Sequence, residues 1–416
     1  MTDVASKQGA EPTAPRSGAF IFIFITVALD MLALGVIVPV FPQLIVQMTG
    51  GSEADAAHWV GFAGTLWALM QFVAMPVFGA ISDTVGRRPI VLLSNFGQGI
   101  DYIFMALSPT LWWLLVGRLI SGVTSASVST AFAYIADVTA PEKRAGAFGL
   151  LGAAFGLGFV IGPAVGGVLG DIDPRLPFWA AAALSLLNGC YGLLVLPESL
   201  PVERRAAFSW RRANPVGSFA MLRANPQILG LATVKFLNDL AHVVYPATFA
   251  LFAMHRYDWG AREVGFTLAA VGVAGIIVHA GLVGRIVAAI GERRALVAGL
   301  ICGGLGFTIY ALAREPWMLF AGIPVAAFWG LAGPSGQALM SQRVGASEQG
   351  RLQGALSSLT GVAGMLGPSI FTGVFAYSIG VSAPTAFAGA AFLTAAVFVT
   401  LGLPLAIASV RHTSGP

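Results

Sequence analysis

The stretch Gly79-Ala-Ile-Ser-Asp83-Thr-Val-Gly86-Arg87-Arg88 decides the fold, because its pattern returns 205 residues later. The second copy reads Gly284-Arg-Ile-Val-Ala-Ala-Ile-Gly291-Glu-Arg-Arg294, with the same spacing of two glycines ahead of an arginine pair. The pair Gly162-Pro163 also returns after 205 residues, as Gly367-Pro368. One offset shared by two unrelated motifs predicts that the two halves of the chain are built on the same plan.

The amino-acid composition excludes an ordinary water-soluble protein. Of the 416 residues, 56% are hydrophobic and 10% are charged, whereas soluble domains carry about 25% charged residues. The same hydrophobicity excludes intrinsic disorder. The two cysteines, Cys190 and Cys302, lie in apolar runs, so we expect neither a disulfide framework nor a metal site. The sequence has no Walker A, H-E-x-x-H or G-x-S-x-G motif, so we expect no cofactor and no enzyme activity.

Apolar runs long enough to cross a bilayer fill most of the chain. A membrane-spanning helix needs about 20 apolar residues. Twelve such runs occur, at residues 19–41, 59–81, 90–108, 111–136, 146–170, 178–196, 227–252, 264–284, 294–313, 317–341, 353–377 and 385–408. The repeat divides these runs into two sets of six. The predicted fold is therefore an all-α membrane protein with twelve transmembrane helices in two pseudo-symmetric six-helix halves.

Charges in the loops predict the orientation of the chain. Most Lys and Arg residues fall in loops on the side of the N-terminus, which the positive-inside rule places in the cytoplasm. The net charge of +4 then reflects topology, and we expect no nucleic-acid partner. The predicted parts are a cytoplasmic tail (1–18), a first half (19–196), a cytoplasmic linker (197–226), a second half (227–408) and a cytoplasmic tail (409–416).

Several motifs resemble those of the major facilitator superfamily. The stretch at 79–88 is similar to its loop signature after the second helix, and Gly117-Arg118-Leu-Ile-Ser-Gly122 to its fourth-helix signature. Gly158-Phe-Val-Ile-Gly162-Pro163 is similar to the antiporter signature of its fifth helix. Within the superfamily, Ala133-Tyr-Ile-Ala-Asp137 and Gly291-Glu-Arg-Arg-Ala-Leu296 resemble the tetracycline/proton antiporters. The resemblance implies the major facilitator fold, drug–proton antiport and a place in the inner (cytoplasmic) membrane.

Three ionisable residues lie within predicted spans of the first half: Asp30, Asp101 and Arg118. A charge at bilayer depth costs at least about 2.5–3.5 kcal/mol. A carboxylic acid in a low-dielectric cavity binds a proton more readily than in water, while a nearby arginine favours the carboxylate. Proton binding and arginine contact therefore oppose each other, as proton coupling requires, and the resemblance implies the same role. The alternative is a static buried ion pair that fixes helix packing.

A second polar group occupies one face of the seventh span. Lys235, Asp239 and His242 lie at positions i, i+4 and i+7, which share a helix face. Histidine changes its charge near physiological pH, so we predict that Asp239 and His242 contribute to proton coupling. The alternative is that Lys235 reaches the membrane interface and simply pairs with Asp239.

The sequence differs from the tetracycline antiporters at a position of the ninth helix that concerns substrate recognition. Their ninth helix carries an essential acid, and the matching residue here is Gly303. The resemblance therefore does not carry tetracycline over as the substrate. The resemblance implies that Gln71 and Gln337 occupy substrate positions of the family's second and tenth helices, where they can offer neutral hydrogen bonds to a cargo molecule. The predicted apolar cargo contacts are Trp67, Phe104 and Phe328.

Other residues are predicted to control opening on the cytoplasmic side. Glycines at every fourth position from Gly158 form a bare ridge that another helix backbone can approach closely. Acids at cytoplasmic helix ends can pair with neighbouring arginines. The predicted gating residues are Gly79, Asp83, Gly86, Arg87, Arg88, Asp137, Arg144, Gly158, Gly162, Pro163 and Gly166.

These observations predict a proton-coupled secondary transporter that exports amphipathic organic molecules. The main alternative is a proton-coupled importer or uniporter of a small organic nutrient or metabolite. A membrane receptor would need a larger domain outside the membrane, and an intramembrane enzyme would need a nucleophile or metal-ligand group. The expected partners are the lipid bilayer, a small amphipathic substrate and protons, and we expect a monomer.

Overall fold

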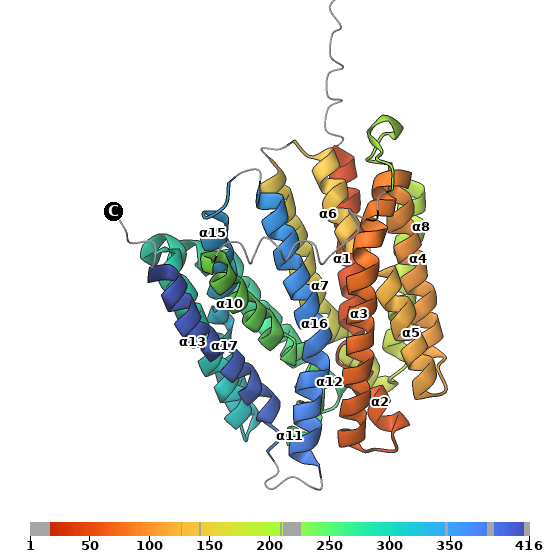
Figure 1. Ribbon diagram of the computed structural model, residues 1–416. Coiled ribbons are helices and arrows are strands. Elements are labelled where there is room, and N and C mark those ends of the chain that lie inside the picture. Colours follow the sequence, from red (N-terminus) through yellow and green to blue (C-terminus); the bar gives the residue numbers. More distant parts are fainter. Residues whose placement is uncertain are drawn as a thin grey trace, which may run out of the picture.

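The computed structural model is an α-helical bundle (Figure 1). It describes residues 17–125, 127–140, 143–208, 210, 226–345, 348–380 and 387–411, and these contain helices, turns and loops but no strand. The predicted tails lie largely outside the described residues. The same is true of most of the predicted linker after residue 208, where only residue 210 is described before residue 226.

Each half of the chain forms its own set of helices (Figure 1). The first half contains α1 (Ser17–Ile37), α2 (Phe41–Met48), α3 (Glu53–Val85), α4 (Arg87–Ala106), α5 (Leu111–Thr124), α6 (Ser127–Val138), α7 (Arg144–Ile172) and α8 (Leu176–Val195). The short helix η2 (Val202–Arg204) follows it. The second half contains α10 (Pro226–His242), α11 (Val244–Tyr257), α12 (Ala261–Ile276), η4 (Ile277–Leu282), α13 (Val283–Leu312), α14 (Pro316–Ala327), η5 (Phe328–Leu331), α15 (Ala332–Ser341), α16 (Gln349–Ile379) and α17 (Ala390–Arg411).

The helices agree with the predicted twelve-span plan. Ten helical stretches among the described residues are long and apolar enough to cross a membrane. One of them, Ala261–Leu312, has 52 residues and changes direction at Gly291, whose φ of 79° and ψ of 157° are not helical. It is therefore long enough for two crossings at about 1.5 Å per residue. The helix α4, which is more polar than the ten, supplies the remaining span.

Two predicted spans are broken in the structure. The span predicted at 19–41 leaves the helix after Ile37 and restarts as α2 at Phe41, because proline at 39 disfavours helical backbone in the residue before it. The span predicted at 111–136 divides into α5 and α6 around Ser125. Each broken span still counts as one apolar stretch, Ile21–Met48 and Leu111–Val138, so the number of spans is unchanged.

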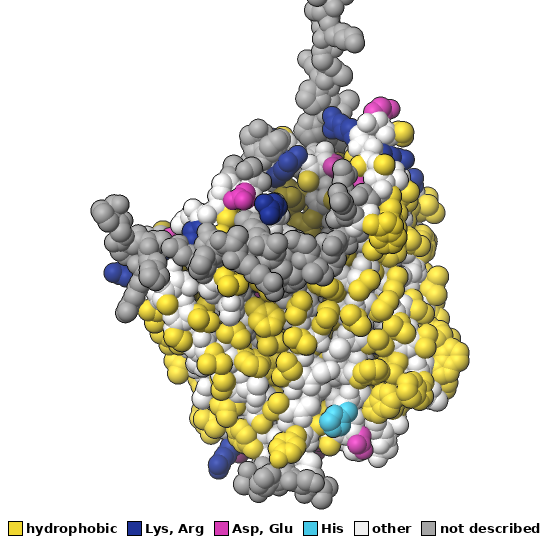
Figure 2. Space-filling view, viewed as in Figure 1, with side chains coloured by type: hydrophobic (Ala, Val, Ile, Leu, Met, Phe, Trp, Pro, Cys, Tyr) yellow, Lys and Arg dark blue, Asp and Glu magenta, His cyan; other side chains and the backbone are white. Residues whose placement is uncertain are grey.

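The outer surface of the bundle is apolar, as a lipid-facing surface must be. Figure 2 shows a broad hydrophobic band around the middle of the molecule, with charged side chains collected towards its two ends. Large apolar side chains stand out from this band, among them Leu194 (84% exposed) and Trp112 (68% exposed). Exposure on this scale is unfavourable in water but favourable against lipid tails.

Glycines bring α1 and α7 into backbone contact, as the spacing of the ridge predicts. A Cβ atom added at Gly162 would lie 2.7 Å from the Cα of Gly35, and one added at Gly158 would lie 2.7 Å from the backbone carbon of Met31. At Gly166 the added atom would collide with the carbonyl oxygen of Val36. A side chain at any of these positions would therefore push the two helices apart.

The two halves meet at the end of the bundle where α2 lies, drawn at the bottom of Figure 1. There, Thr65 of α3 donates a hydrogen bond to the carbonyl oxygen of Met365 (2.9 Å) in α16. Glu53 at the start of α3 pairs with His255 of α11 at 2.5 Å. The helices α7 and α12 also touch, because a Cβ at Gly265 would lie 3.0 Å from the Cα of Gly167.

The opposite end of the bundle, where α3 ends and α4 begins, is called the linker end here because the segment after α8 packs there (Figure 1). Figure 2 shows the molecule hollowed at this end, with Lys, Arg and acidic side chains around the hollow. Contact at one end and a hollow at the other place the interior of the bundle within reach of water from the linker end.

The close packing of α1 on α7 predicts that replacing glycine by alanine has different effects at two positions of α7. Gly166→Ala should lower the free energy of unfolding by about 1–3 kcal/mol, since an added atom that meets backbone cannot be relieved by a side-chain rotation. Gly149→Ala on the same helix meets nothing within 4 Å and should be neutral or stabilising. Thermal unfolding of the purified variants in detergent measures both, and equal melting temperatures would contradict the packing argument.

Candidate functional site

Asp30 is held by a hydrogen bond between two helices of the first half. Its side chain, in the middle of α1, is 2% exposed. The amide of Asn188 in α8 donates to Asp30 Oδ1 at 2.8 Å and to the carbonyl oxygen of Thr26 at 2.9 Å. Asn188 is a neutral donor, so it steadies the carboxyl group without an opposing charge. Sequence reasoning placed Asp30 in the membrane but did not identify Asn188 as its partner.

Asp101 and Arg118 lie near each other but form no ion pair. Asp101 of α4 is fully buried (0% exposed), and no hydrogen bond from a described residue reaches either carboxylate oxygen at normal distance. It packs on Gly117, where an added Cβ would lie 3.2 Å from Oδ1. The guanidinium of Arg118 instead lies 4.3 Å from the centre of the Phe41 ring, an arrangement that stabilises a cation through the face of the ring.

The polar face predicted on the seventh span is present on α10. Lys235 Nζ lies 2.6 Å from Asp239 Oδ2. Thr360 of α16 joins this pair: its hydroxyl donates to Asp239 Oδ2 at 2.6 Å and accepts from Lys235 Nζ at 3.1 Å. The two charged side chains are 27% and 18% exposed. The pair is thus partly exposed and hydrogen-bonded to Thr360, and it connects α10 to α16.

His242 continues this face into an aromatic cluster. Its ring centre lies 5.6 Å from that of Trp329 and 6.0 Å from that of Tyr245. His242 remains exposed although its helix packs inside the second half, so it faces water-accessible space. The indole nitrogen of Trp329 donates a hydrogen bond to Asn238 of α10.

Trp329 also explains the glycine at position 303. A Cβ added at Gly303 would lie 2.8 Å from the Trp329 Cγ atom, so the indole occupies the space that a side chain there would need. The short helix η5 brings Trp329 to this place and turns its neighbour Phe328 towards a small cluster that includes Val278. Phe328 stays a prediction as a cargo contact, and the 3₁₀ turn, which shifts the helical phase, places Trp329 beside the predicted residue His242.

The remaining predicted substrate residues lie at different depths. Gln337 of α15 is exposed and donates to Gln353 at 3.1 Å, and it lines one small pocket together with Lys235 and Asp239. Gln71 and Trp67 of α3 are half-buried. Phe104 of α4 pairs with Trp113 at a ring-centre distance of 4.9 Å. The structure therefore groups Gln337 with Lys235 and Asp239.

At the linker end, two of the predicted gating acids share one arginine. Arg87 lies 2.6 Å from Asp83 Oδ1 and 3.1 Å from Asp137 Oδ2. The hydroxyl of Ser199 also donates to Asp137 Oδ2, at 3.1 Å. Arg144, in contrast, donates to the carbonyl oxygen of Thr139 at 3.1 Å. The cluster therefore joins the ends of α3, α4 and α6.

A further acid, Glu198, caps α4 and was not among the predicted residues. Its carboxylate accepts hydrogen bonds from the backbone N–H groups of Arg87 (2.8 Å) and Arg88 (3.3 Å), the first residues of α4. The backbone turns into α4 at Gly86 with φ +112°, a conformation that favours glycine. A carboxylate at a helix N-terminus satisfies unpaired N–H groups and complements the helix dipole. Its only sequence signal was an acid directly after the last span of the half.

Neither half resembles a catalytic or metal centre. Among the described residues, no three His, Cys, Asp or Glu side chains gather in a way that could hold a metal ion. Two six-helix halves with an internal repeat, contact at one end and ionisable residues buried within the spans are typical of secondary transporters. The fold and the site thus define a membrane transport protein.

Comparison with known proteins agrees with this class. The model of the Major Facilitator Superfamily matches residues 23–368 and 236–413. The chain is 40% identical to the class C tetracycline resistance protein of Escherichia coli, over 87% of this chain and 91% of that protein. It is 37% identical to the class G tetracycline resistance protein of Vibrio anguillarum, over 94% and 97%. The solved structure of an inward-facing, unoccupied bacterial homolog of the human lysosomal transporter Spinster superposes with a TM-score of 0.77 at 19% identity, over 97% and 98%.

The chain belongs to the major facilitator superfamily. It is a multi-pass membrane transporter of small molecules and not an enzyme. The resemblance to the tetracycline resistance proteins that the motifs indicated is confirmed.

The capping role of Glu198 predicts a measurable loss of stability. Glu198→Gln should lower the free energy of unfolding by about 1 kcal/mol, because the carboxylate that meets the start of α4 becomes neutral. Glu203→Gln changes the same residue type five positions later, in η2 (Val202–Arg204), and should have no effect. Thermal unfolding in detergent compares the two variants. The cap is disproved if the two melting temperatures fall together.

Proposed function

We propose that the chain is a proton-coupled secondary transporter that exports amphipathic organic molecules by alternating access. The observation that carries this proposal is the fully buried Asp101, which has no ion pair although Arg118 lies on the adjacent helix. Burial of a carboxylate without a partner is expensive, so such a group is kept where its charge changes during function. The kinship with tetracycline resistance proteins supports drug export as the direction.

In the proposed cycle, Asp101 and Arg118 alternate between two arrangements. With a proton on Asp101, the carboxyl group is neutral and Arg118 stays over the Phe41 ring, as the structure has it. After proton release, the carboxylate attracts the guanidinium, and the helices α4 and α5 that carry the two residues shift relative to each other. Asp30, held by the neutral Asn188, is the second proton acceptor of this half.

The second half supplies the wall on which the cargo rests. In this proposal the ring of His242 faces the cargo, with Trp329 and Tyr245 packed against it. Gln337 adds a neutral amide beside Asp239. Aromatic faces with a few hydrogen-bonding groups suit flat, amphipathic molecules. Tetracycline, named for the relatives, is one candidate, but Trp329 stands where an acid of the ninth helix would need space.

We further propose that the linker end faces the cytoplasm of a cell whose inner membrane holds the protein as a monomer, with both termini inside. The hollow at this end (Figure 2) would then admit cargo from the cytoplasm. Closing the hollow requires the two halves to approach each other at the linker end. The Asp83–Arg87–Asp137 cluster is positioned to control that step. The backbone contacts of Gly162 and Gly166 with α1 let the helices slide without interlocking side chains.

The proton-carrier role predicts a specific defect. Asp101→Asn keeps the shape of the side chain but cannot gain or lose charge, so transport driven by a pH gradient should fall at least about 100-fold while cargo binding persists. Asp171→Asn, an exposed acid at the end of α7, is the matched control and should transport normally. Proteoliposomes with an imposed pH gradient measure both, using compounds chosen from a growth-inhibition panel. Wild-type gradient-driven flux in Asp101→Asn would refute the assignment, and gradient-driven accumulation in the cytoplasmic direction would favour the importer alternative.

The Lys235–Asp239 pair predicts an outcome that separates coupling from scaffolding. Asp239→Asn should shift the pH dependence of transport if Asp239 senses charge, whether of protons or of cargo. A structural pair, in contrast, can be replaced by apolar groups at little cost, so Lys235→Met with Asp239→Leu would then leave the pH profile normal. We expect this double variant to express well but to lose the normal profile. A normal profile would reduce the pair to helix packing.

A further inference from the structure

The internal repeat places a second charged cluster in the other half, and its composition differs. The offset of 205 residues relates Gly86 to Gly291 and Arg88 to Arg293. At the same offset the acids Asp83 and Asp137 become Ala288 and Gln342, and Arg87, which pairs with both acids, becomes Glu292. The second half therefore keeps the glycine turn and the second arginine of the pair but lacks the acids at these positions.

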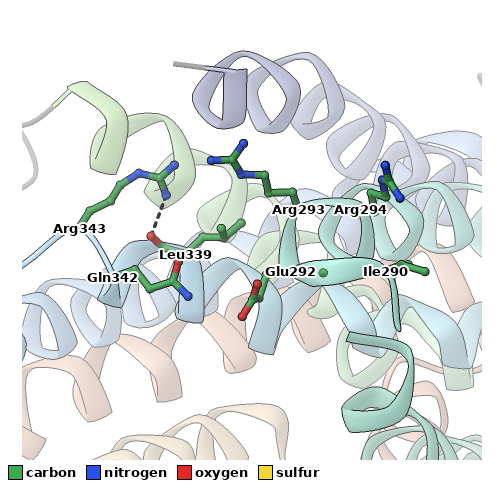
Figure 3. A pocket seen from close by; sticks show the side chains of 8 residues that line it. Ile290, Glu292, Arg293, Arg294, Leu339, Gln342 and Arg343 are labelled. Carbon is green, nitrogen blue, oxygen red and sulfur yellow. Dashed lines mark hydrogen bonds between the residues drawn. The ribbon is translucent and has the colours of Figure 1, made fainter. Parts of the chain in front are cut away.

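A surface pocket of about 420 Å³ occupies this place (Figure 3). It lies between the turn at Gly291 in α13 and the end of α15. Its charged lining residues are Glu292, Arg293, Arg294 and Arg343. Three arginines against one glutamate give the lining a formal charge of +2, whereas the matching cluster of the first half binds its arginine with two acids and caps its helix with a third.

Two arginines of the pocket, Arg343 and Arg293, are close enough for their charges to affect each other. Arg343 lies just beyond α15 and donates to the carbonyl oxygens of Leu339 (2.7 Å) and Ser409 (3.2 Å). Its Nε atom is buried without a hydrogen bond among described residues. Burial lowers the pKa of the Arg343 guanidinium, and the charge of Arg293 lowers it further. An anion between Arg343 and Arg293 would offset both the burial of the Arg343 guanidinium and the repulsion between the two positive charges.

The backbone of this pocket is also prepared for an anion. Gly291 has φ 79°, and the helix restarts at Glu292 after this turn, so the first N–H groups of the new turn lack partners in the preceding one. In the first half, the matching turn at Gly86 is occupied by the carboxylate of Glu198. The repeat thus shows, within the same molecule, that this backbone geometry accepts an anionic group.

We propose that this pocket binds a phosphate group, supplied by the headgroup of an anionic phospholipid. Arginine forks match phosphate oxygens bidentately, and helix starts favour the same charge. The pocket is larger than a carboxylate requires, and its rim includes Ile290, which is 37% exposed. Gln342 and Arg343 of the pocket directly follow the apolar stretch Pro316–Ser341, and the ends of membrane spans are the depth at which phospholipid headgroups lie. The same phosphate chemistry could be met by inorganic phosphate, which the experiment distinguishes.

The test uses the full chain purified in detergent that has been stripped of lipid. Phosphatidylglycerol, phosphatidylcholine and inorganic phosphate are titrated separately, with bound molecules counted by native mass spectrometry and unfolding followed by thermal shift. The test variant is Arg293→Gln with Arg294→Gln, which leaves the capping bonds of Arg343 in place. Arg285→Gln is the control, because Arg285 is another exposed arginine of α13 that does not line the pocket.

We expect phosphatidylglycerol to bind the wild type and Arg285→Gln alike, and to bind the double variant at least about tenfold more weakly. Phosphatidylcholine should bind weakly to all three proteins. Inorganic phosphate binding that depends on Arg293 and Arg294 would support the phosphate site and assign it to a soluble ligand. Equal phosphatidylglycerol affinity for the wild type and the double variant, with no arginine-dependent phosphate binding, would overturn the proposal.

Discussion

The energetic cost of placing a charge inside an apolar bundle determines which partners the ionisable side chains within the spans have. Each ionisable side chain within the spans meets that cost in a different way. Asp30 receives the neutral amide of Asn188, and Lys235 and Asp239 neutralise each other with Thr360 as a bridge. Among the described residues, Asp101 forms no ion pair and no hydrogen bond of normal geometry, although the charge of Arg118 acts on it from the adjacent helix. Because burying a carboxylate without a direct partner is unfavourable by several kcal/mol, Asp101 is the place where charge is expected to move.

Glycine determines how the helices around these charges can move. The ridge on α7 brings two backbones into contact with few interlocking side chains, since Gly158, Gly162 and Gly166 have none. At the contact between the halves, Gly167 and Gly265 do the same for α7 and α12. Smooth surfaces of this kind tolerate rotation that interdigitated side chains would resist. In the proposed cycle, the halves would rock about their contact while each six-helix core stays intact.

Most of the architecture could be predicted from the sequence because it depends on local signals. Span length, the 205-residue repeat and the shared face of Lys235 and Asp239 all follow from spacing along the chain. The interruption after Ile37 had a local signal as well, in the proline at 39, but the apolar run masks it. Hydropathy alone does not show where a helix breaks when both pieces are equally apolar.

The parts that could not be predicted depend on contacts between distant residues. Trp329 fills the space at Gly303, and the 3₁₀ turn that places it leaves no mark in hydrophobic periodicity. Glu198 reaches the start of α4 from 111 residues away, so nothing in its own neighbourhood reveals the cap. Asn188 supports Asp30 from 158 residues away. A sequence read alone identifies the charged groups, but their partners come from the packing of helices against one another.

The two halves share a backbone plan but divide the chemistry. The first half holds the buried carboxyl group of Asp101 beside Arg118, while the second half holds an aromatic cluster and the Lys235–Asp239 pair. Moving a two-state equilibrium from 1:99 to 99:1 takes about 5.5 kcal/mol, and two unit charges 4 Å apart interact by about 4 kcal/mol at an effective dielectric of 20. Switching the charge of one buried carboxyl beside an arginine is therefore of the right size to drive most of a conformational change. In the proposed cycle, the second half would then need only a differential affinity for cargo between the two states, which its rings and amides would provide without any further buried charge.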